Sequence, residues 1–178
     1  MQQMWTDIDH YIDSHLIPED PNLQFALENT ANQGFPDHLA VAPNQGMLLQ
    51  MLIQMNQCKR VLELGTFAAY STVWLARTLP KDGYLLTIEG RDTHAALAQQ
   101  NIDHAQFEVP VELKVGRAAD ILREIDPTTF EPFDFIFIDA DKQSYPEYLE
   151  LTLNLSHSGT ILVLDLSLIH ISEPTRPY

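Results

Sequence analysis

The sequence lacks the features on which secreted, membrane-spanning and zinc-finger proteins depend. A single cysteine, Cys58, stands among 178 residues, so an intrachain disulfide and a cysteine-rich zinc site are both excluded. No apolar run approaches the roughly 20 residues that a membrane helix needs. The first residues show no basic segment followed by an apolar stretch, which is the pattern of a secretory signal. We therefore expect a cytoplasmic protein that has no membrane partner.

Basic residues are also scarce. Ten lysines and arginines stand against 25 aspartates and glutamates, which gives a formal net charge of −15. Binding to nucleic acid would need a basic stripe that this composition hardly supplies, and an acidic surface repels phosphate groups. Most of the acidic residues are expected on solvated faces, where they favour solubility. The charge therefore favours a small-molecule ligand without strong negative charge, and it argues against a nucleic-acid partner.

The first third of the chain shows helical periodicity in three segments. The first segment is closed by Pro18, and Asp20 and Pro21 are predicted to be the N-cap and the first residue of the second helix. A third helix is expected to start near Pro43. Its methionine and leucine side chains are predicted to form a buried core face. These residues are Met47, Leu48, Met51, Leu52 and Met55.

From residue 60 onward, short apolar runs alternate with longer amphipathic ones. The apolar runs are 61–64, 84–88, 111–115, 133–138 and 160–164. This alternation predicts βαβ units, and hence an α/β fold with a doubly wound, mostly parallel sheet covered by helices on both faces. The continuous apolarity of 135–138 and 161–164 is typical of strands buried on both sides. His157, just before the last run, is expected to lie in a loop.

Carboxylates recur where the predicted strands end. Glu63, Glu89, Asp139 and Asp165 each stand at or near the end of a strand, and ligands of such sheets bind beyond the carboxyl ends of the strands. One aspartate alone could be a helix cap, but four carboxylates at one edge favour a ligand site. Gly65 permits a tight turn and a close approach to a ligand. Because Glu89 is placed to accept hydrogen bonds from ribose hydroxyls, we predict a nucleoside-bearing cofactor.

The glycine loop distinguishes between two such cofactors. A dinucleotide is held by a G-x-G-x-x-G loop, and the segment after the first strand lacks this spacing. The single glycine favours S-adenosylmethionine, while an NAD-dependent oxidoreductase stays as an alternative. A non-catalytic, cofactor-binding fragment is the third interpretation.

Four segments together resemble the cation-dependent O-methyltransferases, a family that includes the caffeoyl-CoA and catechol enzymes and many bacterial relatives. They are 63–71 (ELGTFAAYS), 87–89 (TIE), 115–118 (VGRA) and 137–142 (FIDADK). The resemblance extends in order from about residue 5 to residue 165. The Asp-Ala-Asp-Lys element at 139–142 is its most specific part, whereas the E-x-G-T segment and Glu89 are common to many class I methyltransferases.

The resemblance implies a class I methyltransferase fold and the transfer of a methyl group from S-adenosylmethionine to a hydroxyl of a small phenolic, catechol-like acceptor. It places seven residues around the cofactor, namely Val41, Glu63, Gly65, Thr66, Ser71, Glu89 and Ala118. It places a divalent cation, expected to be magnesium, on Asp139 and Asp165. It makes Lys142 the general base, with Asp139 as its catalytic partner, and Asp141 a substrate contact. A homodimer stays an open alternative.

The chemistry of these residue types agrees with the implied roles. A phenol with a pKa of about 10 is mostly protonated at neutral pH, and a divalent cation stabilises the phenolate. Carboxylate oxygens such as those of Asp139 and Asp165 suit magnesium better than zinc. A lysine beside a cation has its ammonium form disfavoured, so Lys142 could accept a proton there.

Two places depart from the family pattern. Ala69 stands where the family usually has glycine, and an alanine at a positive φ costs about 1 kcal/mol. After Asp165 the family continues with an asparagine and an antiparallel pair of strands, but here Leu166 follows. We therefore predict that the methyltransferase domain comprises 1–165, that 166–178 is an atypical tail, and that the last strands of the sheet are missing.

Overall fold

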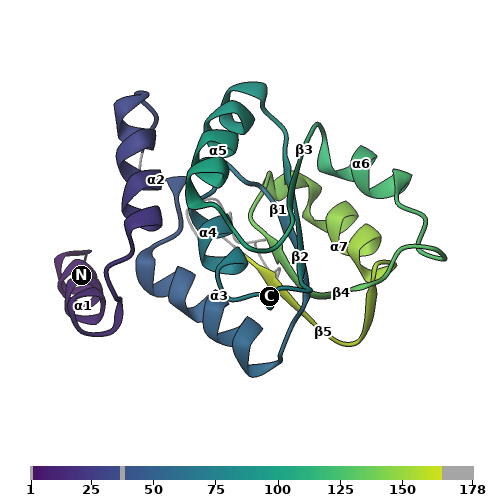
Figure 1. The fold of residues 1–178 in the computed structure, drawn as a ribbon, viewed down its shortest axis with the longest axis horizontal. Helices are drawn as coiled ribbons and strands as arrows, with labels where there is room; N and C mark the ends of the chain where they lie inside the picture. The colour runs from purple at the N-terminus through teal and green to yellow at the C-terminus, as the bar shows by residue number, and fades with distance from the viewer. Residues whose placement is uncertain (1, 37–38, 166–178) are drawn as a thin grey trace, which may run out of the picture.

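Five parallel strands form one sheet in the computed structural model, which describes residues 2–36 and 39–165 (Figure 1). The strands are β1 (Arg60–Leu64), β2 (Tyr84–Glu89), β3 (Val111–Val115), β4 (Phe133–Ile138) and β5 (Ser156–Leu164). Their spatial order is β3-β2-β1-β4-β5, and every neighbouring pair is parallel. The chain therefore adds strands on one side of β1 and then returns to add β4 and β5 on the other. The predicted doubly wound parallel sheet is confirmed.

Helices cover both faces of this sheet. Before β1 lie α1 (Gln2–Leu16), α2 (Pro21–Asn32) and α3 (Pro43–Met55), and between the strands lie α4 (Tyr70–Ala76), α5 (Asp92–Ala105), α6 (Ala118–Glu124), the 3₁₀ helix η2 (Lys142–Ser144) and α7 (Tyr145–Leu153). α3 and α4 pack on one face, and α6 and α7 pack on the other (Figure 1). None of the described helices is long and apolar enough to cross a membrane.

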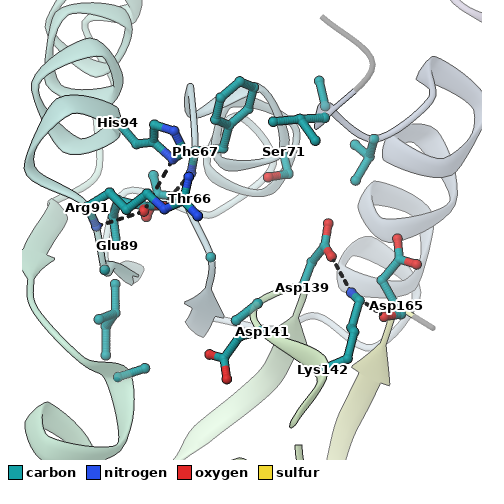
Figure 2. Close-up of a pocket in the computed structure, with 18 of the residues that line it drawn as sticks. Thr66, Phe67, Ser71, Glu89, Arg91, His94, Asp139, Asp141, Lys142 and Asp165 are labelled. Atoms are coloured by element: carbon teal, nitrogen blue, oxygen red, sulfur yellow. Dashed lines mark hydrogen bonds and ion pairs between the residues drawn. The ribbon is translucent and has the colours of Figure 1, made fainter. Parts of the chain in front are cut away.

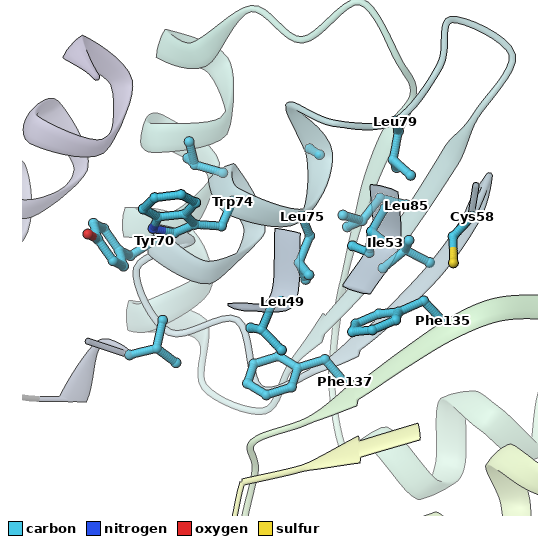
Figure 3. Close-up of a cluster of buried hydrophobic side chains, with 14 of the residues drawn as sticks. Leu49, Ile53, Cys58, Tyr70, Trp74, Leu75, Leu79, Leu85, Phe135 and Phe137 are labelled. Atoms are coloured by element: carbon cyan, nitrogen blue, oxygen red, sulfur yellow. The ribbon is translucent and has the colours of Figure 1, made fainter. Parts of the chain in front are cut away.

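Alternate residues of the strands supply the two cores. Val61, Leu85 and Phe135 are neighbours in register and belong to the cluster beneath α3 and α4. The next residue of each strand belongs to the cluster beneath α6 and α7, as the period of two requires. In Figure 3 the indole of Trp74 and the side chain of Leu49 lie in the first cluster, between helices and sheet. Continuous apolar strands therefore separate two cores, which leaves only the strand ends for polar chemistry.

The starts of the second and third helices are where the sequence predicts them. The Asp20 carboxylate caps α2 by accepting hydrogen bonds from the backbone N–H groups of Asn22 at 2.8 Å and Leu23 at 3.1 Å. Pro21 is the first helical residue of α2, and Pro43 is the first of α3. Both observations follow the preference of helix N-termini for a capping carboxylate and an early proline.

The predicted core face of α3 is only partly right, because Met47 and Leu52 pack against the core but the other three predicted residues do not. Leu48, Met51 and Met55 are 54%, 47% and 75% exposed, whereas Leu49 and Ile53 are buried. The helix is apolar almost all round, so periodicity alone could not select the buried stripe. The selection comes from Gly46, where a Cβ would lie only 2.4 Å from the Trp74 indole nitrogen. The face that contains this glycine is the one that can approach α4.

The last strand differs from the prediction in two respects. β5 begins at Ser156 rather than at 160, so His157 lies in the strand and not in a loop, with its Nε2 2.9 Å from Asp134 Oδ1. Residues 135–138 are fully buried as predicted, but 161–164 are only partly buried, because β5 is the edge of the sheet in the described part of the chain. The tail predicted at 166–178 lies outside the described residues.

Candidate functional site

A cavity of about 910 Å³ opens at the carboxyl ends of the strands, where the strand order reverses. Ten of the site residues named from the sequence line it, namely Val41, Gly65, Thr66, Ser71, Glu89, Ala118, Asp139, Asp141, Lys142 and Asp165. Glu63 does not. Figure 2 shows that the polar residues form two groups, with Glu89 on one side of the cavity and Asp139, Lys142 and Asp165 on the other.

Gly65 joins these two sides. Its φ is +95°, and a Cβ on it would lie 1.9 Å from the main-chain oxygen of Asp139. The Gly65 N–H donates to the Ile88 carbonyl at 2.9 Å, so the turn after β1 is also tied to β2. Only glycine combines this φ with the absence of a side chain, and it therefore allows the ends of β1, β2 and β4 to converge.

The loop that follows Gly65 is held in an uncommon backbone conformation. Phe67 has φ +48° and Ala69 has φ +59°, so the positive φ considered for Ala69 is confirmed. Such a conformation costs a non-glycine residue on the order of 1 kcal/mol. The loop is anchored by the buried Asn101, whose amide donates to the Ala68 carbonyl at 2.8 Å. The strain is thus balanced by a buried hydrogen bond from α5.

The Glu89 carboxylate lies at one end of the cavity with both oxygens fixed. Oε2 accepts from the Phe67 N–H at 2.8 Å, and Oε1 accepts from the Arg91 N–H at 3.0 Å. The His94 Nδ1 lies 3.5 Å from Oε1. Each oxygen keeps a further lone pair, so the carboxylate can accept from two neighbouring hydroxyls, as a ribose presents them.

Aromatic rings line the cavity beside Glu89, and they were not among the site residues predicted from the sequence. The rings of Phe67 and His94 meet edge to face with 5.0 Å between centroids, and Phe35 packs against both at 6.2 and 5.5 Å. Phe67, Arg91 and His94 all line the cavity (Figure 2). These residues come from a loop and a helix start, where no periodicity marks a functional side chain.

The Lys142 ammonium lies at the other end of the cavity. Its Nζ is 2.7 Å from Asp139 Oδ1, 2.7 Å from the Tyr145 hydroxyl and 2.7 Å from the main-chain oxygen of Asp165. The Asp165 carboxylate is held separately, since its Oδ2 accepts from the Gln45 amide at 2.6 Å. β4, β5, η2 and α3 therefore all contribute to this group. Tyr145 and Gln45 were not among the residues predicted from the sequence.

The charges of this group depend on one another. Burial raises the pKa of Asp139, and the neighbouring ammonium of Lys142 opposes that shift. Burial lowers the pKa of Lys142, but its hydrogen bonds to Asp139 and Tyr145 outweigh burial, so this pKa is raised above its ordinary value. With these partners alone, Lys142 therefore holds its proton more firmly than a free lysine.

The third aspartate of the cavity, Asp141, is held apart from that group. Its Oδ1 accepts from the Tyr148 hydroxyl at 2.5 Å. Burial acts to raise the pKa of Asp141, but the hydrogen bonds from Ser144 and Tyr148 outweigh it, and the pKa is lowered. Asp141 is thus an ionised acceptor at the cavity wall, in a place where it can contact a ligand.

Two carboxylates could hold a cation at the Lys142 end. No group of three or more His, Cys, Asp or Glu side chains within 2–36 and 39–165 could hold a metal ion. Magnesium is commonly bound through one or two carboxylates and keeps several waters, so Asp139 and Asp165 fit an open site completed by other oxygens. The ammonium of Lys142 beside Asp139 shows that this place already attracts a positive charge. Position 166, where the family has its third ligand, lies outside the described residues.

Glu63 is placed behind the cavity instead of in it. The side chain is completely buried at the end of β1 and accepts hydrogen bonds from Ser71 Oγ at 2.6 Å, Thr72 Oγ1 at 2.6 Å and Thr87 Oγ1 at 2.7 Å. Burial raises the pKa of Glu63 to about 7, although the three hydroxyls favour the ionised form. The cofactor contact implied by the resemblance is therefore not direct in this structure.

Glu63 is expected to make the protein less stable as the pH rises. An ordinary glutamate titrates near 4.5 and this one near 7, so the folded state binds more protons between these values and stability falls across that window. The slope from one group is at most about 1.4 kcal/mol per pH unit. Subtracting the urea-unfolding free energies of a Glu63→Gln variant from those of the wild type, pH by pH, isolates this contribution. Parallel curves for the two proteins would show that Glu63 titrates normally.

Comparison with known proteins agrees with this geometry. The sequence model of the family described as O-methyltransferase matches residues 14–173. A catechol O-methyltransferase of Niastella koreensis is 48% identical over 163 residues, which are 92% of this chain and 73% of the relative. The matched range includes every cavity residue described above.

Solved structures show the same fold. The O-methyltransferase of Bacillus cereus in complex with SAH has a TM-score of 0.87 and 44% identity, with 93% of this chain and 74% of that chain covered. The O-methyltransferase TomG of Streptomyces achromogenes, involved in tomaymycin synthesis and solved in complex with SAM, has a TM-score of 0.86 and 43% identity, with 92% and 73% covered.

Proposed function

Since the chain belongs to the family of S-adenosylmethionine-dependent O-methyltransferases, we propose that it transfers the methyl group of S-adenosylmethionine to a hydroxyl of a small phenolic, catechol-like acceptor with the help of a divalent cation. The observation that carries this proposal is the two-sided cavity. One side presents a fixed carboxylate, Glu89, and the other presents Lys142 between Asp139 and Asp165. Gly65 brings the two sides together.

The Glu89 side suits the nucleoside of the methyl donor. Two backbone N–H groups hold the carboxylate in place before any ligand arrives, and such preorganisation increases affinity because less ordering accompanies binding. Ala118 lines the cavity from the start of α6 and leaves room for a flat base. The relatives in complex with SAH and SAM support the same cofactor.

The Lys142 side suits an acceptor with hydroxyl groups. Asp139, Asp141 and Asp165 outnumber the single ammonium there, so this end favours neutral or cationic acceptors over phosphate-bearing ones. The relative named as a catechol O-methyltransferase supports an acceptor with two vicinal hydroxyls. A divalent cation on Asp139 and Asp165 would supply electrostatic stabilisation of a phenolate.

The chain's own residues would handle the proton of the acceptor. Lys142 Nζ lies at the cavity wall within hydrogen-bond distance of three oxygens, so it is placed to receive the proton once its amine form is favoured. A positive charge close to an ammonium favours that form. The hydroxyl of Tyr145 and the main-chain oxygen of Asp165 then fix the direction of Nζ. The deprotonated acceptor oxygen attacks the methyl carbon, and the thioether leaves as the neutral product.

Methyl transfer to catechol is the direct test. We expect methylated product from the purified chain with S-adenosylmethionine, catechol and magnesium, and its loss on adding a chelator. Glu89→Ala should weaken the binding free energy of S-adenosylmethionine by roughly 1.5–3 kcal/mol, the range for hydrogen bonds to a charged group. The matched control is Glu108→Ala, which removes a carboxylate whose side chain is 72% exposed and pairs with Lys81. Equal affinity of all three proteins in calorimetry would refute the ribose assignment.

Two other interpretations predict different outcomes. A non-catalytic fragment would bind S-adenosylmethionine and form no product from any acceptor, including flavonoids and hydroxycinnamoyl esters. An NAD-dependent oxidoreductase would show a change in NADH fluorescence on binding. The family match and the missing G-x-G-x-x-G loop both count against the oxidoreductase.

A further inference from the structure

Asp165 is held by three different parts of the fold. Its N–H donates to the Ile138 carbonyl at 2.9 Å, which continues the ladder between β4 and β5. Its main-chain oxygen lies 2.7 Å from Lys142 Nζ and 2.6 Å from the Tyr145 hydroxyl. The carboxylate is held by a separate contact, the hydrogen bond from the Gln45 amide of α3 at 2.6 Å. The sheet and Lys142 therefore fix the backbone of Asp165, whereas Gln45 fixes the direction of its side chain.

The Gln45 amide is itself held in one orientation. Its Oε1 accepts from the Ala42 N–H at 3.3 Å, so the side chain reaches back over the first turn of α3. A glutamine amide has an acceptor end and a donor end. Since the acceptor end is turned to Ala42, the NH₂ end faces Asp165. A glutamate at this position could accept from Ala42 but could not donate to Asp165.

The neutrality of Gln45 distinguishes Asp165 from the other carboxylate of this group. The Asp139 carboxylate is paired with the ammonium of Lys142 at 2.7 Å, which offsets its charge. Gln45 holds the Asp165 carboxylate without offsetting its charge. Within the described part of the chain, Oδ2 is the oxygen of Asp165 that has a hydrogen-bond partner. Both Gln45 and Asp165 line the cavity, so Oδ1 stays available to a ligand there.

We propose that Gln45 is a positioning residue for the divalent cation, and that its amide holds the Asp165 carboxylate so that one charged oxygen is presented to that cation. The inference rests on the proposed function, since it needs a cation on Asp139 and Asp165. A ligand that is already oriented loses less conformational freedom when the cation binds. Residues that orient metal ligands commonly contribute 10–100-fold to metal affinity or activity, although they do not touch the metal.

A merely structural Gln45 predicts a different result. Its bond from Ala42 supports the first turn of α3, and the loss of that bond alone would lower the free energy of unfolding without changing the affinity for a cation. A positioning role changes cation affinity, because it acts through the charge and the orientation of Asp165.

The test is titration of the purified chain with Mn²⁺ in place of magnesium, with the electron paramagnetic resonance signal of free Mn²⁺ as the readout. Gln45→Met keeps much of the side-chain length and removes the donor. We expect the Kd for Mn²⁺ to rise roughly 10–100-fold. An unchanged Kd overturns the inference. Failure of the wild type to bind Mn²⁺ overturns instead the role of the cation in the proposed function.

Gln45→Glu separates positioning from helix capping, and it also serves if the methionine variant does not fold. Glutamate keeps an acceptor for the Ala42 N–H but brings a second carboxylate beside Asp165. An added negative charge close to the cation should lower the Kd for Mn²⁺ at least about fivefold, which is opposite to the effect of Gln45→Met. A wild-type Kd in Gln45→Glu would place the cation away from Asp165 and contradict the proposal.

Gln54→Met is the matched control for the loss of a glutamine from α3. Gln54 is exposed on the same helix and is not among the residues that line the cavity. Its replacement should leave the Kd for Mn²⁺ unchanged. If Gln54→Met weakened Mn²⁺ binding as much as Gln45→Met does, the effect would not come from the contact with Asp165, and the proposal would be wrong.

Discussion

Replacing Gly65 with alanine is expected to abolish cofactor binding and to lower the free energy of unfolding by at least about 3 kcal/mol. The added Cβ would lie 1.9 Å from the main-chain oxygen of Asp139, in a backbone with φ +95°. This oxygen belongs to the end of β4, which cannot move without separating β4 from β1. Urea unfolding and calorimetric titration with S-adenosylmethionine measure the two effects.

Gly34→Ala is the matched control for backbone strain. Gly34 has φ +77° and nothing within 4 Å of the position that a Cβ would occupy. We expect it to lose only about 1 kcal/mol, the usual penalty of a positive φ without a steric clash. If both variants lost the same amount, the close approach of the two strand ends would not be the reason for a glycine at 65.

Replacing Lys142 with methionine is expected to lower kcat by about 100-fold or more, the range of a lost general base, with little change in the Kd for S-adenosylmethionine. Methionine keeps much of the length of the side chain but cannot accept the acceptor's proton. Asp139→Asn should act in the same direction, because the partner of Lys142 Nζ at 2.7 Å loses its charge. Steady-state kinetics with catechol, together with calorimetry, separates turnover from cofactor affinity.

Lys114→Met provides the control for loss of a lysine charge. The Lys114 side chain is 42% exposed on β3 and lies 3.7 Å from Glu112, so its removal should leave kcat unchanged. A Lys142→Met enzyme with wild-type turnover would exclude Lys142 as the base. Turnover that persists in the presence of a chelator would exclude a role for a divalent cation in the reaction.

Much of the fold could be predicted because its strands are short and apolar. β3 and β4 have the predicted bounds, since turns and charged segments on both sides delimit each run. The face of α3 could not be predicted, because its apolar residues surround the helix and only the contact between Gly46 and Trp74 selects one side. The extra residues of β5 were missed because Ser156 and His157 are polar.

Reasoning from the residues alone could predict the part of the site that depends on strand ends, and the resemblance to the family added Val41, Ser71 and Ala118, which also line the cavity. Asp139 and Asp165 follow apolar runs, and the parallel sheet brings them to one edge. Glu63 has the same signal, but it lies within β1, one residue before the strand ends, and its side chain is completely buried. His94 lines the cavity and Tyr145 holds Lys142 because of how their helices pack, which a single sequence does not encode locally.

The order of the strands also determines when the site can be completed during synthesis of the chain. Val61 pairs with Leu85 on one side and with Phe135 on the other. A nascent chain that has reached residue 115 can pair β1, β2 and β3, and it already contains Gly65 and Glu89. The second edge of β1 stays bare until β4 emerges, and a bare apolar edge invites pairing with other chains. The half of the site that contains Glu89 is thus made first, and the half that contains Lys142 covers the open edge of β1 afterwards.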